Sequence, residues 1–344
     1  MAVVATADPA AGRLGRSSRG RRSGRRVRQP GSRAAYACIA PFFLIFGAFS
    51  IYPWLDTAWQ SLHDTRLTTY NESNWVGLAN YQNLFTHQFF WNALKNTITI
   101  GIISTVPQLI LALGIAHLLN YRLRARTFFR VTLLLPYATS LAAATVIFVE
   151  LFSADYGLIN WVLNGVLHLP KVDWQASKWP SQIAVSTIVI WRWTGYNALI
   201  YLAGMQAIDD TLYEAAAIDG ASKWAQFRYV TLPGLRPTIL FTIVVSTIGA
   251  TQLFGEPLLY SPTHQPDGGT SGYYQTLGVL MYQQGWTYGR LGLAAATAWT
   301  MFVIILLAVA ANLLLVRWRE RRGGLGTPLE RSPQLAATAQ ETQR

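Results

Sequence analysis

Long apolar stretches separated by polar segments are the dominant pattern of this chain. There are six such stretches, and each contains at most two charged residues. The stretches are residues 34–54, 93–118, 128–152, 183–205, 237–259 and 291–316. Each is long enough to cross about 30 Å of hydrocarbon at about 1.5 Å per residue. Strand-like alternation is absent, and backbone groups in lipid must be hydrogen-bonded within their own segment, so helices are expected. The pattern predicts an all-α polytopic membrane protein with six transmembrane helices, which excludes an ordinary soluble domain.

The composition agrees with this pattern and locates the tails. Hydrophobic residues make up 51% of the chain and charged residues only 13%, whereas soluble domains carry about 25% charged residues. Residues 1–33 are rich in Arg, Gly and Ser, and residues 321–344 are rich in Gly, Pro and Gln. We expect both tails to be disordered and residues 34–320 to form one membrane domain.

The net charge of +12 is distributed unevenly between the connecting segments. Nine arginines precede the first stretch, and further basic clusters follow the second, fourth and sixth stretches. In a six-span protein these segments share one side of the membrane, so the positive-inside rule places them and both termini in the cytoplasm. The basic N-terminal tail has two readings, a lipid-attracted anchor or a nucleic-acid-binding arm, and the anchor is favoured. Cys38 is the only cysteine, which excludes an intrachain disulfide.

A polar, helix-forming segment lies between the fourth and fifth stretches. Thr211 followed by Glu214 fits a capping box at a helix start, and Gly220 offers a position where the chain can turn with positive φ. A second short helix would follow, with Trp224 and Phe227 on one side. The segment is then either a docking element for a partner groove or a connection whose aromatic side chains pack on the bundle. The residues alone leave these alternatives open.

This segment resembles the EAA loop of permease subunits of ABC importers. The loop pattern is Glu-Ala-Ala, three residues, Gly, about nine residues, then an aliphatic residue, any residue and Leu-Pro. The matching residues are Glu214, Ala215, Ala216, Gly220, Val230, Leu232 and Pro233. Flanking residues 231–237 resemble the carbohydrate-uptake branch, and residues 76–81 and 91–97 resemble the first of its two permeases, the one like the larger maltose-transporter subunit. The likeness covers residues 34–320.

The resemblance implies a division of labour in a bacterial plasma membrane. A second permease would form a heterodimer with this chain, and two copies of a separate ATPase, holding ATP and Mg, would bind the loop. An extracellular lipoprotein would deliver an oligosaccharide. The ATPase-docking residues would be Glu214, Ala215, Ala216, Asp219, Gly220, Ala221, Trp224, Phe227, Leu232 and Pro233. The chain has no G-x-x-x-x-G-K-[ST] phosphate loop, so we expect no ATP hydrolysis, no cofactor and no metal in the chain itself.

A sugar pathway needs hydrogen-bonding groups beside aromatic faces. The resemblance and the polar residues of the fourth and fifth stretches together predict the contacts Trp193, Tyr196, Asn197, Thr251, Gln252 and Glu256. Interhelical hydrogen bonding is the alternative for each of them. Arg192 and Glu256 would pair either with each other or with the partner subunit. In the outer loops, tryptophans fit an interfacial belt or sugar stacking, and Gly268-Gly269-Thr270 departs from the Gly-Gly-Pro of many relatives.

Two rival functions remain, a secondary transporter or channel that works alone, and a membrane-embedded enzyme. A solitary carrier needs ion-coupling carboxylates inside its spans, and Glu256 by itself is weak support for such a mechanism. An enzyme needs a catalytic constellation, and neither H-E-x-x-H nor G-x-S-x-G occurs. The sequence therefore favours an importer permease over both, without naming its sugar.

Overall fold

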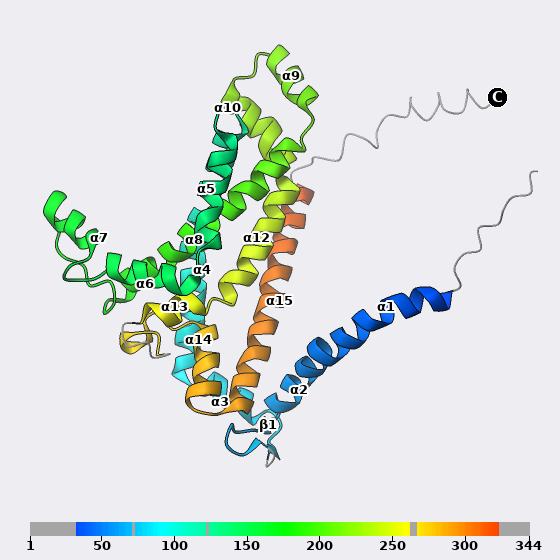
Figure 1. The fold of residues 1–344 in the computed structure, drawn as a ribbon, viewed down its shortest axis with the longest axis vertical. Helices are drawn as coiled ribbons and strands as arrows, with labels where there is room; N and C mark the ends of the chain where they lie inside the picture. The colour runs from blue at the N-terminus through cyan, green and yellow to red at the C-terminus, as the bar shows by residue number, and fades with distance from the viewer. Residues whose placement is uncertain (1–31, 71–72, 122–123, 262–266, 323–344) are drawn as a thin grey trace, which may run out of the picture. The chain divides into compact units, whose positions relative to one another are not determined.

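The computed structural model describes residues 32–70, 73–121, 124–261 and 267–322 (Figure 1). The helices and helical turns are α1 Ser32–Phe46, η1 Gly47–Ile51, α2 Tyr52–Ser61, α3 Ala79–Thr86, α4 Gln88–Asn120, α5 Arg126–Ala138, α6 Leu141–Leu151, α7 Leu158–Trp161, η3 Val162–Val166, α8 Lys178–Gln206, α9 Asp210–Ile218, α10 Lys223–Gln226, η4 Phe227–Thr231, α11 Leu232–Gly234, α12 Arg236–Thr251, α13 Gly255–Tyr260, η5 Thr270–Gly272, α14 Leu277–Tyr282, η6 Gln283–Thr287 and α15 Leu291–Arg322. A short antiparallel hairpin, β1 His63–Asp64 with β2 Asn74–Trp75, interrupts the expected all-α fold in a loop.

The chain forms two units, residues 1–54 and residues 55–344. The described part of the first unit is an apolar helix, α1 continued by η1 and the start of α2, with an exposed surface rich in Phe and Ile. Nearly all of residues 1–33 and 321–344, predicted to be disordered tails, lie outside the described residues.

The core of the second unit lies where α4 packs along α8. Small residues make this contact possible: Ala112 and Ala116 of α4 and Ala184 and Ala198 of α8 are fully buried. Small side chains let helix backbones approach closely in a membrane, where van der Waals packing rather than the hydrophobic effect holds helices together. The α4–α8 pair is therefore the frame against which the functional residues are placed.

Two predicted spans are broken rather than continuous. The stretch 128–152 forms α5 and α6, which meet at 88°, because Thr139 and Ser140 have non-helical backbone after the proline-containing end of α5. The stretch 237–259 is helical only to Thr251, and α13 follows after a non-helical turn. Apolar periodicity cannot show such breaks, since the residues on both sides remain apolar.

Three helices of the described residues are long and apolar enough to cross a membrane, namely residues Tyr36–Ser61, Gln88–Asn120 and Leu291–Val316. Two bent pairs, one in residues 127–151 and one in residues 223–251, raise this number to five if each is one span. Helix α8 is not among them, because polar residues in its middle, Arg192 included, lower its mean hydropathy. The count of six spans stays a prediction.

Candidate functional site

The polar segment between α8 and α12, residues 207–235, forms an elbow at one end of the second unit, the top in Figure 1. Its first arm is α9, and the N-cap is Asp209, whose carboxylate accepts a hydrogen bond from the Thr211 backbone N–H at 2.9 Å. The capping box predicted at Thr211 and Glu214 is therefore wrong, because the helix begins two residues earlier. The same N–H lowers the pKa of the exposed Asp209 carboxyl, because the hydrogen bond stabilises its ionised form.

Gly220 makes the turn of the elbow, as predicted, with φ of +78°. The Ala221 N–H donates to the Ala216 carbonyl at 2.9 Å and the Gly220 N–H to the Ala217 carbonyl at 3.1 Å, which closes the end of α9. Ser222 then caps α10 by accepting from the Ala225 N–H. Left-handed backbone suits glycine because it lacks Cβ.

The second arm of the elbow is anchored to the bundle. Phe227 is buried and its ring lies 4.5 Å from that of His117 near the end of α4. The Tyr213 and Thr231 hydroxyls, 2.9 Å apart, tie the first arm to the second. Trp224 and Phe227 were expected on one side of the second helix, either for a partner or packed on the bundle; Trp224 is exposed and stacks on the buried Phe227. Phe227 thus positions the elbow instead of presenting a surface anchor.

The remaining elbow residues form a mostly open surface. Glu214, Ala215, Asp219, Gly220 and Pro233 are exposed, and Ala216, Ala221 and Leu232 are half-buried. Sequence reasoning missed three large apolar side chains exposed on the same elbow, Leu212, Ile218 and Tyr229. The sequence could have indicated them, because they are apolar residues within a polar segment. Apolar side chains that the bundle does not cover are available to a partner.

A cavity of about 480 Å³ lies between α4, α8, α12 and the turn into α13. Of the six residues predicted to contact a sugar, five line it: Trp193, Tyr196, Asn197, Gln252 and Glu256. Thr251 does not, because its hydroxyl donates to the Thr247 carbonyl within α12. Ser104 and Gln108 of α4 and Ser246 of α12 also line the cavity and were not predicted. An isolated polar residue in an apolar stretch does not indicate which face of the helix points into a cavity.

Three aromatic rings gather beside this cavity. Tyr137 of α5 stacks on Tyr196 with ring centroids 4.9 Å apart, and Trp193 meets both rings edge to face. Asn197, almost fully buried, donates to the Trp193 carbonyl, so its amide oxygen is left for another donor. Rigid aromatic faces next to amides and hydroxyls are the surface that a polar ring-shaped solute requires.

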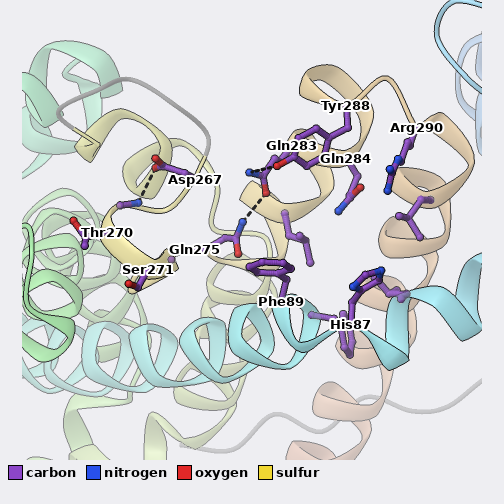
Figure 2. A pocket seen from close by; sticks show the side chains of 16 residues that line it. His87, Phe89, Asp267, Thr270, Ser271, Gln275, Gln283, Gln284, Tyr288 and Arg290 are labelled. Atoms are coloured by element: carbon purple, nitrogen blue, oxygen red, sulfur yellow. Dashed lines mark hydrogen bonds between the residues drawn. The ribbon is translucent and has the colours of Figure 1, made fainter.

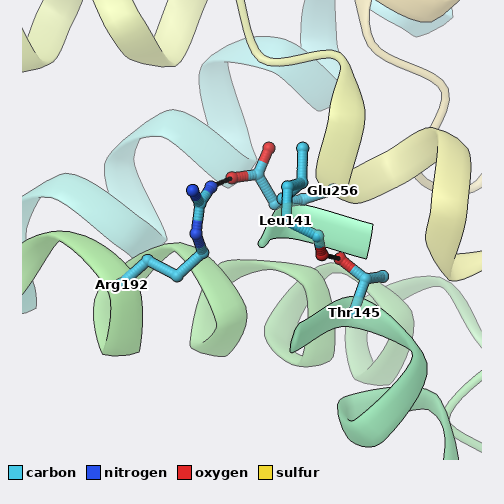
Figure 3. Close-up of polar contacts among 4 residues, drawn as sticks. All are labelled: Leu141, Thr145, Arg192 and Glu256. Carbon is cyan, nitrogen blue, oxygen red and sulfur yellow. Dashed lines mark hydrogen bonds and ion pairs between the residues drawn. The ribbon is translucent and has the colours of Figure 1, made fainter. Parts of the chain in front are cut away.

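Arg192 and Glu256 form a buried ion pair at the cavity, with Arg192 Nη1 donating to Glu256 Oε1 at 2.9 Å (Figure 3). The two residues therefore pair with each other in this chain, which is one of the two alternatives that the sequence left open. The pair joins α8 to α13, 64 residues apart. A charge in an apolar medium is stable only with such a partner.

The comparisons with known proteins agree with this architecture. The family described as the binding-protein-dependent transport system inner membrane component matches residues 108–321, which include the whole elbow. The chain therefore belongs to this family of transport-system permeases and is a multi-pass membrane protein. Its relatives are transport subunits and not enzymes.

Relatives share most of their length with this chain. It is similar to the lactose transport system permease of Rhizobium radiobacter, 34% identical over 83% of this chain and 93% of that protein. The trehalose/maltose transport system permease of Thermococcus litoralis is 31% identical over 84% and 95%. A chain in the crystal structure of a bacterial alginate ABC transporter in complex with a periplasmic protein has the same fold, with a TM-score of 0.70, 23% identity, and coverage of 86% of this chain and 97% of that chain.

Proposed function

We propose that this chain is one of the two permease subunits of an ATP-driven importer for a small oligosaccharide in a bacterial plasma membrane. The observation that carries the proposal is that one chain has both a polar and aromatic cavity, lined by Trp193, Tyr196 and Asn197, and the exposed elbow. Relatives named as transport permeases for lactose, trehalose and maltose, and arabinooligosaccharides support the substrate class.

In the proposed arrangement the elbow lies in the cytoplasm and binds a separate ATPase that holds ATP and Mg. Basic residues at the same end of the bundle support this orientation, including Arg130, Lys223 and Arg236. Both termini would be cytoplasmic, and α8 and the bent α5–α6 pair would each count as one of six crossings. A second permease and an extracellular sugar-binding lipoprotein complete the assembly.

Reconstitution tests the proposed function directly. The chain is co-expressed with a second permease, an ATPase and a sugar-binding lipoprotein from the same genome and placed in vesicles. We expect uptake of a radiolabelled oligosaccharide that needs ATP and the lipoprotein and that stops when the ATPase phosphate-loop lysine is replaced. Uptake by this chain alone, without ATP, would show a solitary carrier instead.

The sugar contact is tested by Tyr196→Ala combined with Asn197→Ala. This variant removes the stacked ring and the buried amide from the cavity, so uptake is expected to fall about tenfold or more, equivalent to about 1.4 kcal/mol. ATPase co-purification should not change, because the elbow is not altered. Tyr201→Phe is the matched control on the same helix, since Tyr201 binds Thr242 away from the cavity. Normal uptake by the double variant would exclude these residues as contacts.

The docking turn is tested by Gly220→Val. No neighbouring atom lies within 4 Å of a Cβ added there, so the effect is expected from backbone strain alone, about 1–2 kcal/mol for left-handed geometry. The elbow should rearrange and the ATPase should fail to co-purify, while the protein still inserts. Gly220→Asn, which tolerates this geometry, should retain the ATPase. Equal co-purification with both variants would reject the turn as a docking element.

A further inference from the structure

A second, larger cavity of about 640 Å³ lies at the end of the bundle opposite the elbow. Its walls come from the end of α3, the start of α4, residues 267–275, η6 and the start of α15 (Figure 2). It shares no lining residue with the first cavity. Its size is within the range of about 300–1,000 Å³ that small-molecule sites occupy.

Amide side chains form the polar wall of the second cavity. Gln275 Nε2 donates to Gln283 Oε1 at 2.7 Å, and Gln283 Nε2 donates to the Tyr288 hydroxyl at 3.3 Å, which fixes all three side chains. The side-chain oxygen of Gln284 is buried and has no hydrogen-bond partner among the described residues. A buried acceptor without a donor costs about 1–3 kcal/mol, so this oxygen favours a ligand that brings a hydroxyl.

The loop that forms one rim is held rigidly by the core. Asn92 and Asn96 of α4 both donate to the Gly272 carbonyl, at 3.0 and 2.8 Å. Gln182 of α8 donates to Asn96 and to the Tyr273 carbonyl, at 2.9 and 2.8 Å. A rim fixed from two helices is formed before any ligand arrives, which lowers the ordering cost of binding.

The charges and the exposed aromatic ring indicate the kind of ligand. Phe89 lies at the cavity with 67% of its surface exposed, and an apolar ring face so placed suits the apolar face of a sugar ring. Figure 2 shows Asp267 and Arg290, one of each sign, at opposite ends of the cavity. Since neither sign of charge dominates, the lining favours a neutral polyhydroxylated ring over a sugar acid.

We propose that this second cavity is a separate saccharide-binding site on the outer face, which holds one or two neutral sugar rings before they reach the first cavity. The proposal rests on the proposed function, because that function sets which face is outside and why a sugar would arrive there. Phe89 supplies the stacking face, Gln284 accepts from a sugar hydroxyl, and Arg290 donates to the sugar at the opposite end from Asp267.

Cysteine protection in the complete importer tests the site. In a Cys38→Ser background, His87→Cys and Thr270→Cys are each labelled from outside with a membrane-impermeant maleimide; both residues are exposed in the lining, and neither is assigned a sugar contact. Lactose, maltose and trehalose are added separately as probes. At ten times its dissociation constant, a binding sugar should slow labelling about tenfold. Thr287→Cys, exposed on η6 at the same end of the bundle but outside the lining, is the matched control and should be unaffected.

The role of Phe89 gives a second measurement. Adding Phe89→Leu to the Thr270→Cys variant should raise the sugar concentration for half-maximal protection about fivefold, the loss of an aromatic contact of about 1 kcal/mol. An unchanged concentration, protection of neither cysteine, or equal slowing at position 287 would overturn the site. ATP-driven uptake of the same sugars is measured in parallel. Intact uptake without protection rejects only the second site, whereas absent uptake of every probe rejects the proposed function.

Discussion

Glu256→Leu is expected to destabilise the membrane domain by about 3–5 kcal/mol, because it leaves the buried Arg192 guanidinium without its counter-charge. The two side chains are only 7% and 14% exposed, so solvent cannot replace the lost carboxylate effectively. Arg192 Nε already has no hydrogen-bond partner among the described residues, which leaves the Glu256 contact as the main compensation for this cation. Thermal unfolding of the detergent-purified protein, followed by size-exclusion chromatography, measures the effect.

The double variant Arg192→Met with Glu256→Leu is the control for that result. Replacing both members of a buried pair with apolar residues is often neutral or stabilising, whereas removing one is strongly destabilising. We therefore expect the double variant to recover most of the lost melting temperature. If Glu256→Leu alone melts like the wild type, or if the double variant is worse than the single one, the pair does not have the stabilising role inferred from its geometry.

Gly195→Ala is expected to separate α5 from α8. A Cβ at Gly195 would overlap the Leu133 backbone carbonyl of α5, and backbone cannot rotate away as a side chain can. Overpacking of this kind costs about 1–3 kcal/mol, and a clash with backbone should reach the upper end. Because Tyr137 on α5 stacks on Tyr196 next to this contact, uptake should fall even where the protein still inserts. Melting temperature and vesicle uptake report the two effects.

Gly114→Ala is the matched control for that substitution. It also adds one methyl group to a glycine inside a long helix, but no atom lies within 4 Å of the added Cβ. Alanine is favoured over glycine in helices by about 0.5–1 kcal/mol, so stability should be equal or higher. If Gly195→Ala leaves both melting temperature and uptake at the control level, close α5–α8 contact is not required for transport.

The elbow is the element for which local sequence was most informative. Gly220 turns with positive φ as predicted, and the two short helices on either side are both present. These features depend on interactions within a few residues, and such interactions can be read from neighbouring positions. The predicted start of α9 was wrong because Asp209 and Thr211 are both favourable N-cap residues. Which of them caps the helix depends on the position of the chain where it leaves α8.

The cavity shows the opposite case. The aromatic cluster needs Tyr137, which lies in an apolar stretch with nothing to mark it, and the ion pair joins residues from two different helices. Phe227 reads as a surface anchor until its contact with His117 is seen. The bend at Thr139 and Ser140 lies inside a stretch whose composition does not change.

The sequence by itself determined that the chain is a helical membrane protein, where its apolar segments lie, and where the elbow turns. Only the tertiary structure decided which helices are broken, which face of each helix meets a neighbour, and which polar groups share a cavity. The physical reason is that lipid and protein interior are both apolar, so hydrophobicity identifies a span but does not distinguish its packed face from its lipid face.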